Sequence, residues 1–246
     1  MNAYSGFADV YDLLMDDFDY PAWADYYCRL LERIRPQLIC DCACGTGSMS
    51  VEFARRGMRV TGVDISREML ENAAEKTRHA GVQVQFACQD MCRLQLPKAV
   101  DALVCACDGV NYLTTDKRLT AFFEAAHRAI RPGGMLAFDF SSRYKLIETM
   151  GNAFFGEERD EAAYLWQNSV DGDIVTMDIT FFLLEDEEEG LYRRVTERHR
   201  QKAHDPAHIK ALLEQAGFAD ICIFGDKTME APGERELRVH ISAVRE

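Results

Sequence analysis

The stretch Asp41-Cys42-Ala43-Cys44-Gly45-Thr46-Gly47 decides the fold of this chain. The apolar residues 37–40 precede it and predict a buried strand, and residues 48–56 predict a helix that ends at Gly57. A strand that turns through glycines into a helix brings backbone N–H groups and the positive end of a helix dipole to one point. This turn therefore suits a ligand that lies directly against the backbone.

An acidic residue, Asp64, follows the next predicted strand, which covers residues 58–63. Its position, about 20 residues after the turn, is typical of a carboxylate that accepts hydrogen bonds from ribose hydroxyls. A dinucleotide-binding turn would read GxGxxG, but Ser50 stands at the third glycine. The pattern has no place for a diphosphate. With Asp41 inside the turn, a carboxylate and backbone carbonyls could instead meet the ammonium group of an amino acid.

In these motifs the sequence resembles the class I S-adenosylmethionine (SAM) dependent methyltransferases. Asp41 to Gly47 matches their first motif, although Ala43 stands where many members carry glycine. Three further stretches fall where the later motifs of that family fall: Asp64-Ile65-Ser66, Asp90-Met91 and Arg131-Pro132-Gly133-Gly134. The resemblance covers nearly the whole chain. The N-terminal aromatic residues and Glu197-x-His199 look like a group of small bacterial methyltransferases whose substrates are mostly unassigned.

The order of the predicted elements indicates an α/β fold. Together with the resemblance it implies a doubly wound, Rossmann-like and mostly parallel seven-stranded sheet with an inserted antiparallel β lid. From residue 164 to 202 strand signals replace helices, with a hairpin turn at 171–173 and an acidic turn at 185–190. We expect a SAM-binding core at 1–150 and 203–246, with a helical arm at 1–35, and a lid subdomain at 151–202.

The resemblance also implies a cofactor site. Gly45 and Gly47 would pack beneath SAM with Asp41 near its ammonium group, and Asp64 would bind the ribose hydroxyls. Asp90 follows a strand predicted at 82–87 and would bind adenine, whose ring faces Ile65 and Met91 would contact. A helix or turn cap is the alternative role for Asp90. Further expected cofactor contacts come from the arm and the core: Tyr4, Tyr11, Ala43, Met69 and Cys107.

The strand predicted at 99–107 leads into residues that would form the wall of an acceptor pocket: Asp108, Asn111 and Tyr112. From the lid, Trp166 and Tyr192 would add to this wall. Glu197 and His199 share one face of a lid strand by period two. His199 could act as a general base with Glu197 as its orienter, and both are candidate catalytic residues. A surface histidine without a catalytic role is the alternative.

The composition narrows the choice of partners. A net charge of −13 argues against duplex nucleic acid, although a tRNA anticodon loop stays open. The chain has neither the roughly 20 consecutive apolar residues of a membrane span nor a signal peptide, so we expect a cytoplasmic protein. Its nine cysteines, an odd number, predict reduced thiols, and their C-x-C spacing suits a metal poorly, so we expect no metal.

We therefore predict a SAM-dependent methyltransferase that acts on a small molecule, with nitrogen or oxygen as the favoured acceptor atom. The core itself does not choose between acceptor atoms. Two alternatives are an NAD(P)-dependent oxidoreductase, whose third glycine Ser50 replaces, and a non-catalytic SAM-binding module. The sequence indicates no oligomeric state.

Overall fold

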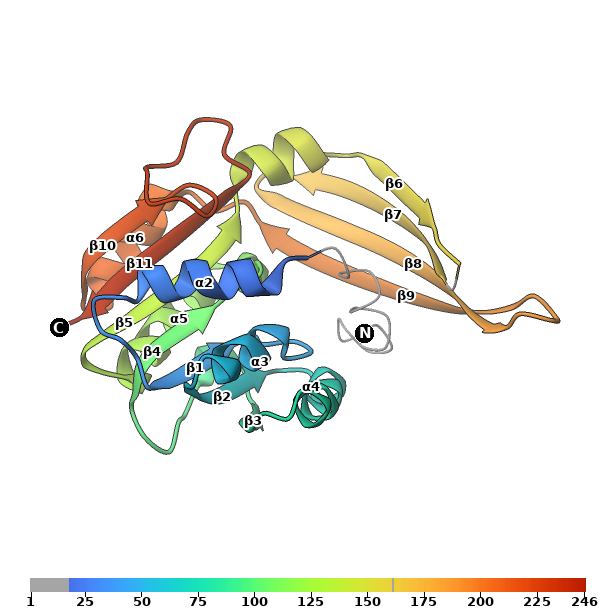
Figure 1. The fold of residues 1–246 in the computed structure, drawn as a ribbon. Coiled ribbons are helices and arrows are strands. Elements are labelled where there is room, and N and C mark those ends of the chain that lie inside the picture. Colours follow the sequence, from blue (N-terminus) through green and yellow to red (C-terminus); the bar gives the residue numbers. More distant parts are fainter. Residues whose placement is uncertain (1–17, 161) are drawn as a thin grey trace.

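The computed structural model describes residues 18–160 and 162–246. The larger sheet, sheet A, has seven strands in the order β10-β11-β5-β4-β1-β2-β3 (Figure 1). Five strands run parallel: β1 Leu38–Cys42, β2 Arg59–Asp64, β3 Val84–Cys88, β4 Val100–Cys105 and β5 Ile130–Ser141. Two antiparallel strands complete one edge: β10 Phe218–Phe224 and β11 Arg238–Arg245. The predicted mostly parallel seven-stranded sheet is confirmed.

Five α-helices among the described residues accompany these strands: α2 Tyr20–Leu30, α3 Ser48–Arg55, α4 Arg67–His79, α5 Asp116–Ala129 and α6 Pro206–Gln215. Ser66 accepts a hydrogen bond from the Met69 N–H, and Asp205 accepts one from the Ala207 N–H. Ser66 and Asp205 are therefore the N-caps of α4 and α6. α2 ends at Leu30, and residues 31–34 form turns.

The helices cover both faces of sheet A, which makes the fold doubly wound. α2 and α3 pack on the face that carries Ile39, whereas α5 and α6 pack on the face that carries Cys40 and Cys42. This explains the cysteine spacing, since every second strand residue points to the same side. All nine cysteines are free thiols, and those within β1 and β4 act as small apolar core residues. Cys88 and Cys222 are exposed instead.

Three short helical segments follow strands of sheet A. They are η1 (Met91–Arg93) after β3, η2 (Gly109–Tyr112) after β4, and a π-helix, η3 (Tyr144–Met150), after β5. The sequence predicts none of them, because segments this short show no clear helical period. Within the described part of the chain, no helix is long and apolar enough to cross a membrane.

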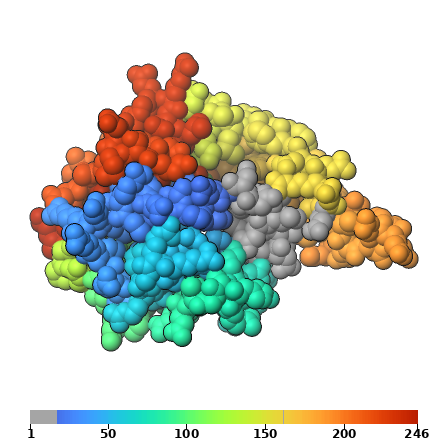
Figure 2. Space-filling model, viewed as in Figure 1, coloured from blue at the N-terminus to red at the C-terminus, as the bar shows by residue number. Residues whose placement is uncertain are grey.

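A second, antiparallel sheet, sheet B, is inserted between β5 and α6 and extends away from sheet A (Figures 1 and 2). Its strands, in spatial order, are β6 Phe154–Glu158, β7 Ala162–Asp171, β8 Ile174–Asp186 and β9 Leu191–Lys202. Both predicted turns are confirmed. Alternate residues of β8, from Val175 to Leu183, are buried, and we call their side of the sheet its inner face. The sequence does not predict β6, which is short and has no alternating pattern.

The turn between β1 and α3 needs its glycines for two different reasons. Gly45 (φ +54°) borders open space, because a Cβ added there would meet none of the described residues within 4 Å. Gly47 (φ +78°) is tightly packed, because an added Cβ would lie 2.8 Å from the Cβ of Ala73 in α4. Gly45 thus leaves backbone open to a ligand, whereas Gly47 lets α4 approach the turn.

Replacing the two glycines by alanine should separate backbone strain from packing. Gly45→Ala places alanine in the left-handed region and should lower the free energy of unfolding by about 1–2 kcal/mol. Gly47→Ala adds an overlap with Ala73 and should cost about 1–3 kcal/mol more. Urea unfolding of the two variants without cofactor measures both losses. Equal losses would show that α4 does not pack tightly on the turn.

Candidate active site

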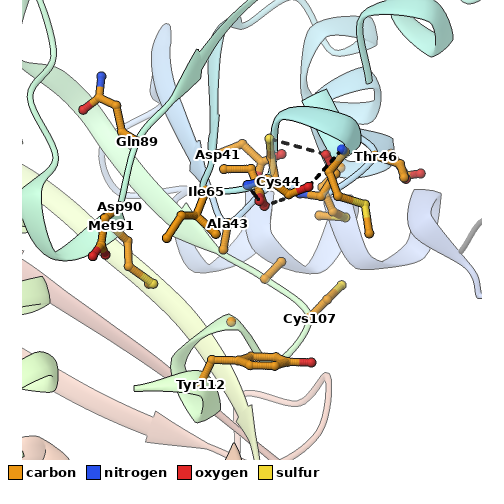
Figure 3. Close-up of a pocket in the computed structure, with 18 of the residues that line it drawn as sticks. Asp41, Ala43, Cys44, Thr46, Ile65, Gln89, Asp90, Met91, Cys107 and Tyr112 are labelled. Carbon is orange, nitrogen blue, oxygen red and sulfur yellow. Dashed lines mark hydrogen bonds between the residues drawn. The ribbon is translucent and has the colours of Figure 1, made fainter. Parts of the chain in front are cut away.

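A cavity of about 570 Å³ opens at the carboxyl edge of sheet A (Figure 3). Its walls include the ends of β1 and β2, the segments after β3 and β4, and the first residues of α3 and α4. β1 and β4 are neighbours in the sheet, although the chain forms β2 and β3 between them. Ligands of doubly wound folds bind at such a switch point. The volume also falls in the range of small-molecule sites.

Ten of the residues singled out in the sequence line this cavity. They are Asp41, Ala43, Gly45, Asp64, Ile65, Met69, Asp90, Met91, Cys107 and Tyr112. Figure 3 shows Asp90 and Met91 on one side of the cavity and Cys107 with Tyr112 on another. Stretches that lie far apart in the sequence therefore meet in one site.

Asp41, near the end of β1, is buried in the cavity wall. The Ser50 hydroxyl donates a hydrogen bond to its Oδ2 atom at 2.6 Å. Burial raises the pKa of Asp41 to about 7, and the bond from Ser50 opposes part of that rise. A cation bound beside Asp41 would favour its ionised form. Ser50, which stands at the third glycine of a dinucleotide site, thus fixes the position of the Asp41 carboxylate through this hydrogen bond.

Asp64, at the end of β2, fastens the glycine turn. Its Oδ2 atom accepts a hydrogen bond from the Gly45 N–H at 2.9 Å, and its Oδ1 atom accepts one from the Ser66 N–H at 2.8 Å. Burial raises the pKa of Asp64, and these backbone donors oppose the rise. A carboxylate offers about four lone-pair positions. Asp64 can therefore fix the turn and still accept hydrogen bonds from a diol.

Asp90, which follows β3, combines a turn cap with a place in the cavity wall. It accepts a hydrogen bond from the Cys92 N–H at 3.0 Å, and the Arg118 guanidinium lies 3.1 Å from the same oxygen. Burial alone would raise the pKa of Asp90, but these two donors hold it below its ordinary value. The carboxylate is therefore ionised at neutral pH and suited to accept a hydrogen bond from an amino group.

The backbone after β4 turns sharply beside the cavity. Cys107 (φ +61°) and Asp108 (φ +68°) both adopt the left-handed conformation, which is uncommon for residues other than glycine. Their N–H groups donate to the buried carboxylate of Asp139 on β5, at 2.8 and 3.2 Å. The Tyr27 hydroxyl of α2 donates to the same carboxylate at 2.6 Å. Asp139 therefore fixes the turn that brings Cys107 to the cavity.

A largely buried arginine completes this cluster. Arg238, at the start of β11, forms ion pairs with both Asp108 and Asp139. Its guanidinium lies over the Trp23 ring, 4.9 Å from the ring centroid. Asp108 also accepts a hydrogen bond from the Ser141 hydroxyl at 3.0 Å. The Asp108 carboxylate therefore binds other groups of the protein, and Asp108 does not line the cavity.

Asn111 joins the two ends of the segment that forms sheet B. Its side-chain NH₂ donates to the backbone oxygens of Ser141 and Lys202, at 3.1 and 2.9 Å. Its Oδ1 atom accepts from the Ser141 N–H at 2.8 Å. Ser141 ends β5 and Lys202 ends β9. Asn111 is fully buried, does not line the cavity, and holds sheet B beside the β4 turn.

His199 and Tyr112 connect the inner face of sheet B to the cavity. Tyr112 lines the cavity, and its hydroxyl lies 3.2 Å from Nδ1 of His199 on β9. Burial lowers the pKa of His199 to about 4, so the imidazole is neutral at neutral pH. Glu197, two residues earlier on β9, is also buried. Neither Glu197 nor His199 is part of the cavity lining itself.

The other predicted site residues do not line the cavity or lie outside the described residues. Gly47 faces α4 behind the turn. Trp166 donates a hydrogen bond to the Asn168 side chain at 2.5 Å and packs on the apolar cluster of sheet B. Tyr192 is 52% exposed. The predictions for Tyr4 and Tyr11 concern residues outside those that the structure describes.

Several cavity residues are not predicted from the sequence: Tyr20, Cys44, Thr46, Ser48, Met49, Gln89 and Arg118. Thr46 and Ser48 do carry a signal, since they lie directly on either side of Gly47 in the glycine turn. Arg118 carries none. It comes from α5 and reaches Asp90 across 28 residues of sequence, so that only the tertiary fold connects them.

The shifted pKa of His199 makes a stability prediction. A histidine in the unfolded chain titrates near 6.5, so between that pH and about 4 the unfolded chain binds more protons than the folded chain. The free energy of unfolding should therefore fall on acidification through this window, by on the order of 3 kcal/mol from His199 alone. His199→Gln should remove this pH-dependent contribution to the free energy of unfolding. Urea unfolding at several pH values measures it, and parallel curves for both proteins would contradict it.

Four matches among known proteins point to one family. A family model described as a methyltransferase domain matches residues 39–134. A relative from Geobacillus sp. (strain WCH70), provisionally named a methyltransferase, is 33% identical, and the match covers 98% of each chain. A SAM-dependent methyltransferase from Clostridium acetobutylicum superposes with a TM-score of 0.88 at 29% identity, covering 99% of each chain. The sugar N-methyltransferase KedS8 from Streptoalloteichus shares the fold, with a TM-score of 0.79 at 20% identity over 100% of this chain and 94% of that one.

The likeness to the Geobacillus and Clostridium proteins spans nearly the whole chain, so it includes sheet B as well as the glycine turn. The NAD(P)-dependent oxidoreductase considered above lacks support from the turn, in which Ser50 replaces the third glycine, and from this similarity over the whole length. The chain therefore belongs to the SAM-dependent methyltransferases, with SAM as its methyl donor.

Proposed function

We propose that this methyltransferase acts on a small polar molecule at a nitrogen or oxygen atom, bound between the cavity and the inner face of sheet B. The contact between His199 and Tyr112 carries this proposal, because it joins a titratable group of sheet B to the cavity wall. The fold shared with a sugar N-methyltransferase is compatible with such an acceptor. The net charge of −13 favours a small molecule over nucleic acid.

The cavity residues fit SAM. The open space at Gly45 leaves backbone accessible, and Asp64 has lone pairs for the ribose hydroxyls. The ionised carboxylate of Asp90 suits the adenine amino group, with Met91 and the 63% exposed side chain of Ile65 for the ring faces. On this proposal Asp41 meets the ammonium group. The remaining cofactor contacts proposed in the cavity wall are Ala43, Met69 and Cys107.

When bound, SAM supplies a methyl group that is already activated on a sulfonium, so the protein need not generate a reactive species. The task of the chain is to hold the acceptor in line with that methyl group. Correct positioning can contribute about 7–11 kcal/mol to lowering the barrier. Sheet B would do this as the lid subdomain at 151–202, over a core at 1–150 and 203–246.

On this proposal, His199 handles the proton of an acceptor that carries one. A neutral imidazole has one accepting nitrogen and one N–H. Its low pKa keeps His199 in this form at neutral pH, and the Tyr112 hydroxyl at 3.2 Å fixes the ring orientation. A histidine with this pKa is a weak base, which suits an acceptor whose own proton becomes acidic as the new bond forms. Glu197 would help to orient the acceptor or the imidazole.

The proposed ribose contact makes a binding prediction. Asp64→Asn keeps the side-chain size but removes the charge, and it should weaken SAM binding by about 1.5–3 kcal/mol, or roughly 10- to 150-fold. Isothermal titration calorimetry measures the change. Asp116→Asn, at an exposed ion pair on α5, is the control and should bind SAM like the wild type. Unchanged affinity in Asp64→Asn would remove Asp64 from the cofactor site.

The proposed role of His199 predicts a separation of turnover from cofactor affinity. A metabolite screen with labelled SAM identifies an acceptor, and His199→Ala should then lower turnover at least about tenfold, since a positioned proton acceptor contributes roughly 10²–10⁴. SAM affinity should stay near the wild-type value. Gln201→Ala is a matched control, because Gln201 is as buried as Glu197 and lies on the same face of β9. An equal loss of turnover in both variants would indicate a general defect of sheet B.

A further inference from the structure

A second groove lies beside β3 and at the amino ends of β1, β2 and β4, away from the active-site cavity at their carboxyl ends. Its volume is about 1100 Å³, which is above the range of small-molecule sites. Residues 82–86 line it in unbroken succession. Because successive residues of a strand point to opposite faces of a sheet, such a groove follows the edge of the strand rather than one face. At this edge of sheet A, β3 pairs only with β2 among the described residues (Figure 1).

The sequence of β3 differs from that of the other edge strands. The four strands at the edges of the two sheets are β3, β6, β9 and β10. β6 and β9 carry charged residues, and β10 contains Asp220 and a register shift against β11 between Ala219 and Cys222. Charges and bulges of this kind hinder the pairing of an edge with another strand. β3 is Val-Gln-Phe-Ala-Cys, without a charged residue or a proline, so it keeps the ability to pair with a further strand.

The groove beside this edge is positively charged. Its charged residues are Arg59 at the start of β2, Arg78 in the last turn of α4 and Lys98 before β4, and all three are exposed. No acidic residue is among the described residues that line it, although acidic residues outnumber basic ones by 41 to 28 in the chain. The rest of the lining is mostly apolar and includes Met58 and Leu96. The groove thus combines apolar surface with a local excess of positive charge.

We propose that the free edge of β3 binds an extended, acidic segment of a partner protein, which adds a strand to sheet A. Main-chain hydrogen bonds to the edge supply affinity in this mode of binding, and the alternating side chains of the segment supply specificity. The apolar lining would contact apolar side chains of the segment, and the three cations would contact its carboxylates. The proposal is independent of the methyl acceptor, because no described residue lines both the groove and the active-site cavity.

A second copy of the chain fits this edge less well than an acidic partner. Two copies that paired β3 with β3 about a two-fold axis would share one self-complementary surface. Arg59, Arg78 and Lys98 of one copy would then lie near the same cations of the other copy, and like charges repel at short range. An acidic segment carries the opposite charge, which favours its encounter with the groove and its correct orientation there. The charge of the lining therefore selects an acidic partner over self-association.

A selection of displayed peptides on the full chain supplies the probe for the test. Random twelve-residue peptides on phage are selected against the wild-type chain, and the proposal predicts sequences in which Asp or Glu alternates with apolar residues. By fluorescence anisotropy, these peptides should bind the double variant Arg59→Glu and Lys98→Glu at least about tenfold more weakly than the wild type, because two attractions become repulsions. Arg128→Glu, at an exposed cation of α5 outside the groove, is the matched control and should bind like the wild type.

Hydrogen–deuterium exchange of the wild-type chain locates the bound peptide and does not depend on how any variant folds. Strand addition should slow the exchange of segment 82–88 and leave β10, the opposite edge of sheet A, unchanged. The double variant should bind S-adenosylhomocysteine like the wild type, since neither residue lines the active-site cavity.

Three results would overturn the proposal: selected peptides without an acidic bias, equal binding of the peptides to the wild type and the double variant, or unchanged exchange of segment 82–88. Protection of this segment in a concentration-dependent dimer of the free chain would also overturn it, because the edge would then serve self-association.

Discussion

The site depends on carboxylates at strand ends that accept hydrogen bonds from the backbone of neighbouring loops. Asp64 at the end of β2 holds the N–H of Gly45, and Asp139 on β5 holds the N–H groups of Cys107 and Asp108. Buried carboxylates are costly unless such donors satisfy them, so the loops and the acids stabilise each other. The two loops that border the cavity at β1 and β4 are therefore fixed before any ligand binds. A preorganised edge of this kind reduces the ordering that a ligand must impose.

Hydrogen bonds beside the same edge also hold the inserted sheet B in place. The chain leaves sheet A at Ser141 and returns from sheet B at Lys202, and the side chain of Asn111 binds the backbone of both. Because Asn111 belongs to the turn after β4, the inner face of sheet B starts beside the cavity. The buried polar residues His199 and Glu197 lie on this inner face. On the proposed function, sheet B is the region in which acceptor specificity can vary while the core keeps its fold.

The sequence was informative where one local pattern defines a site. The glycine turn and the acids at Asp64 and Asp90 could be found because each follows a recognisable strand, and parallel strands end at the same edge. The partners of Asp108 and Asn111 could not be found, because Arg238 and Lys202 follow them by 130 and 91 residues. The low pKa of His199 is also a tertiary property, since it comes from burial on the inner face of sheet B. Local sequence patterns therefore identify the residues at the carboxyl edge of sheet A. The side chains that hold these residues in place can be identified only from the fold.

The central claim is that SAM lies along the carboxyl edge of sheet A, between the end of β1 and the segment after β3. A crystal structure of the chain with S-adenosylhomocysteine tests it most directly. The account predicts ligand density with the ribose hydroxyls at Asp64, the adenine amino group at Asp90, and the amino acid end beside the glycine turn. Density at another place, or with the nucleoside reversed so that adenine meets the glycine turn, would contradict the account.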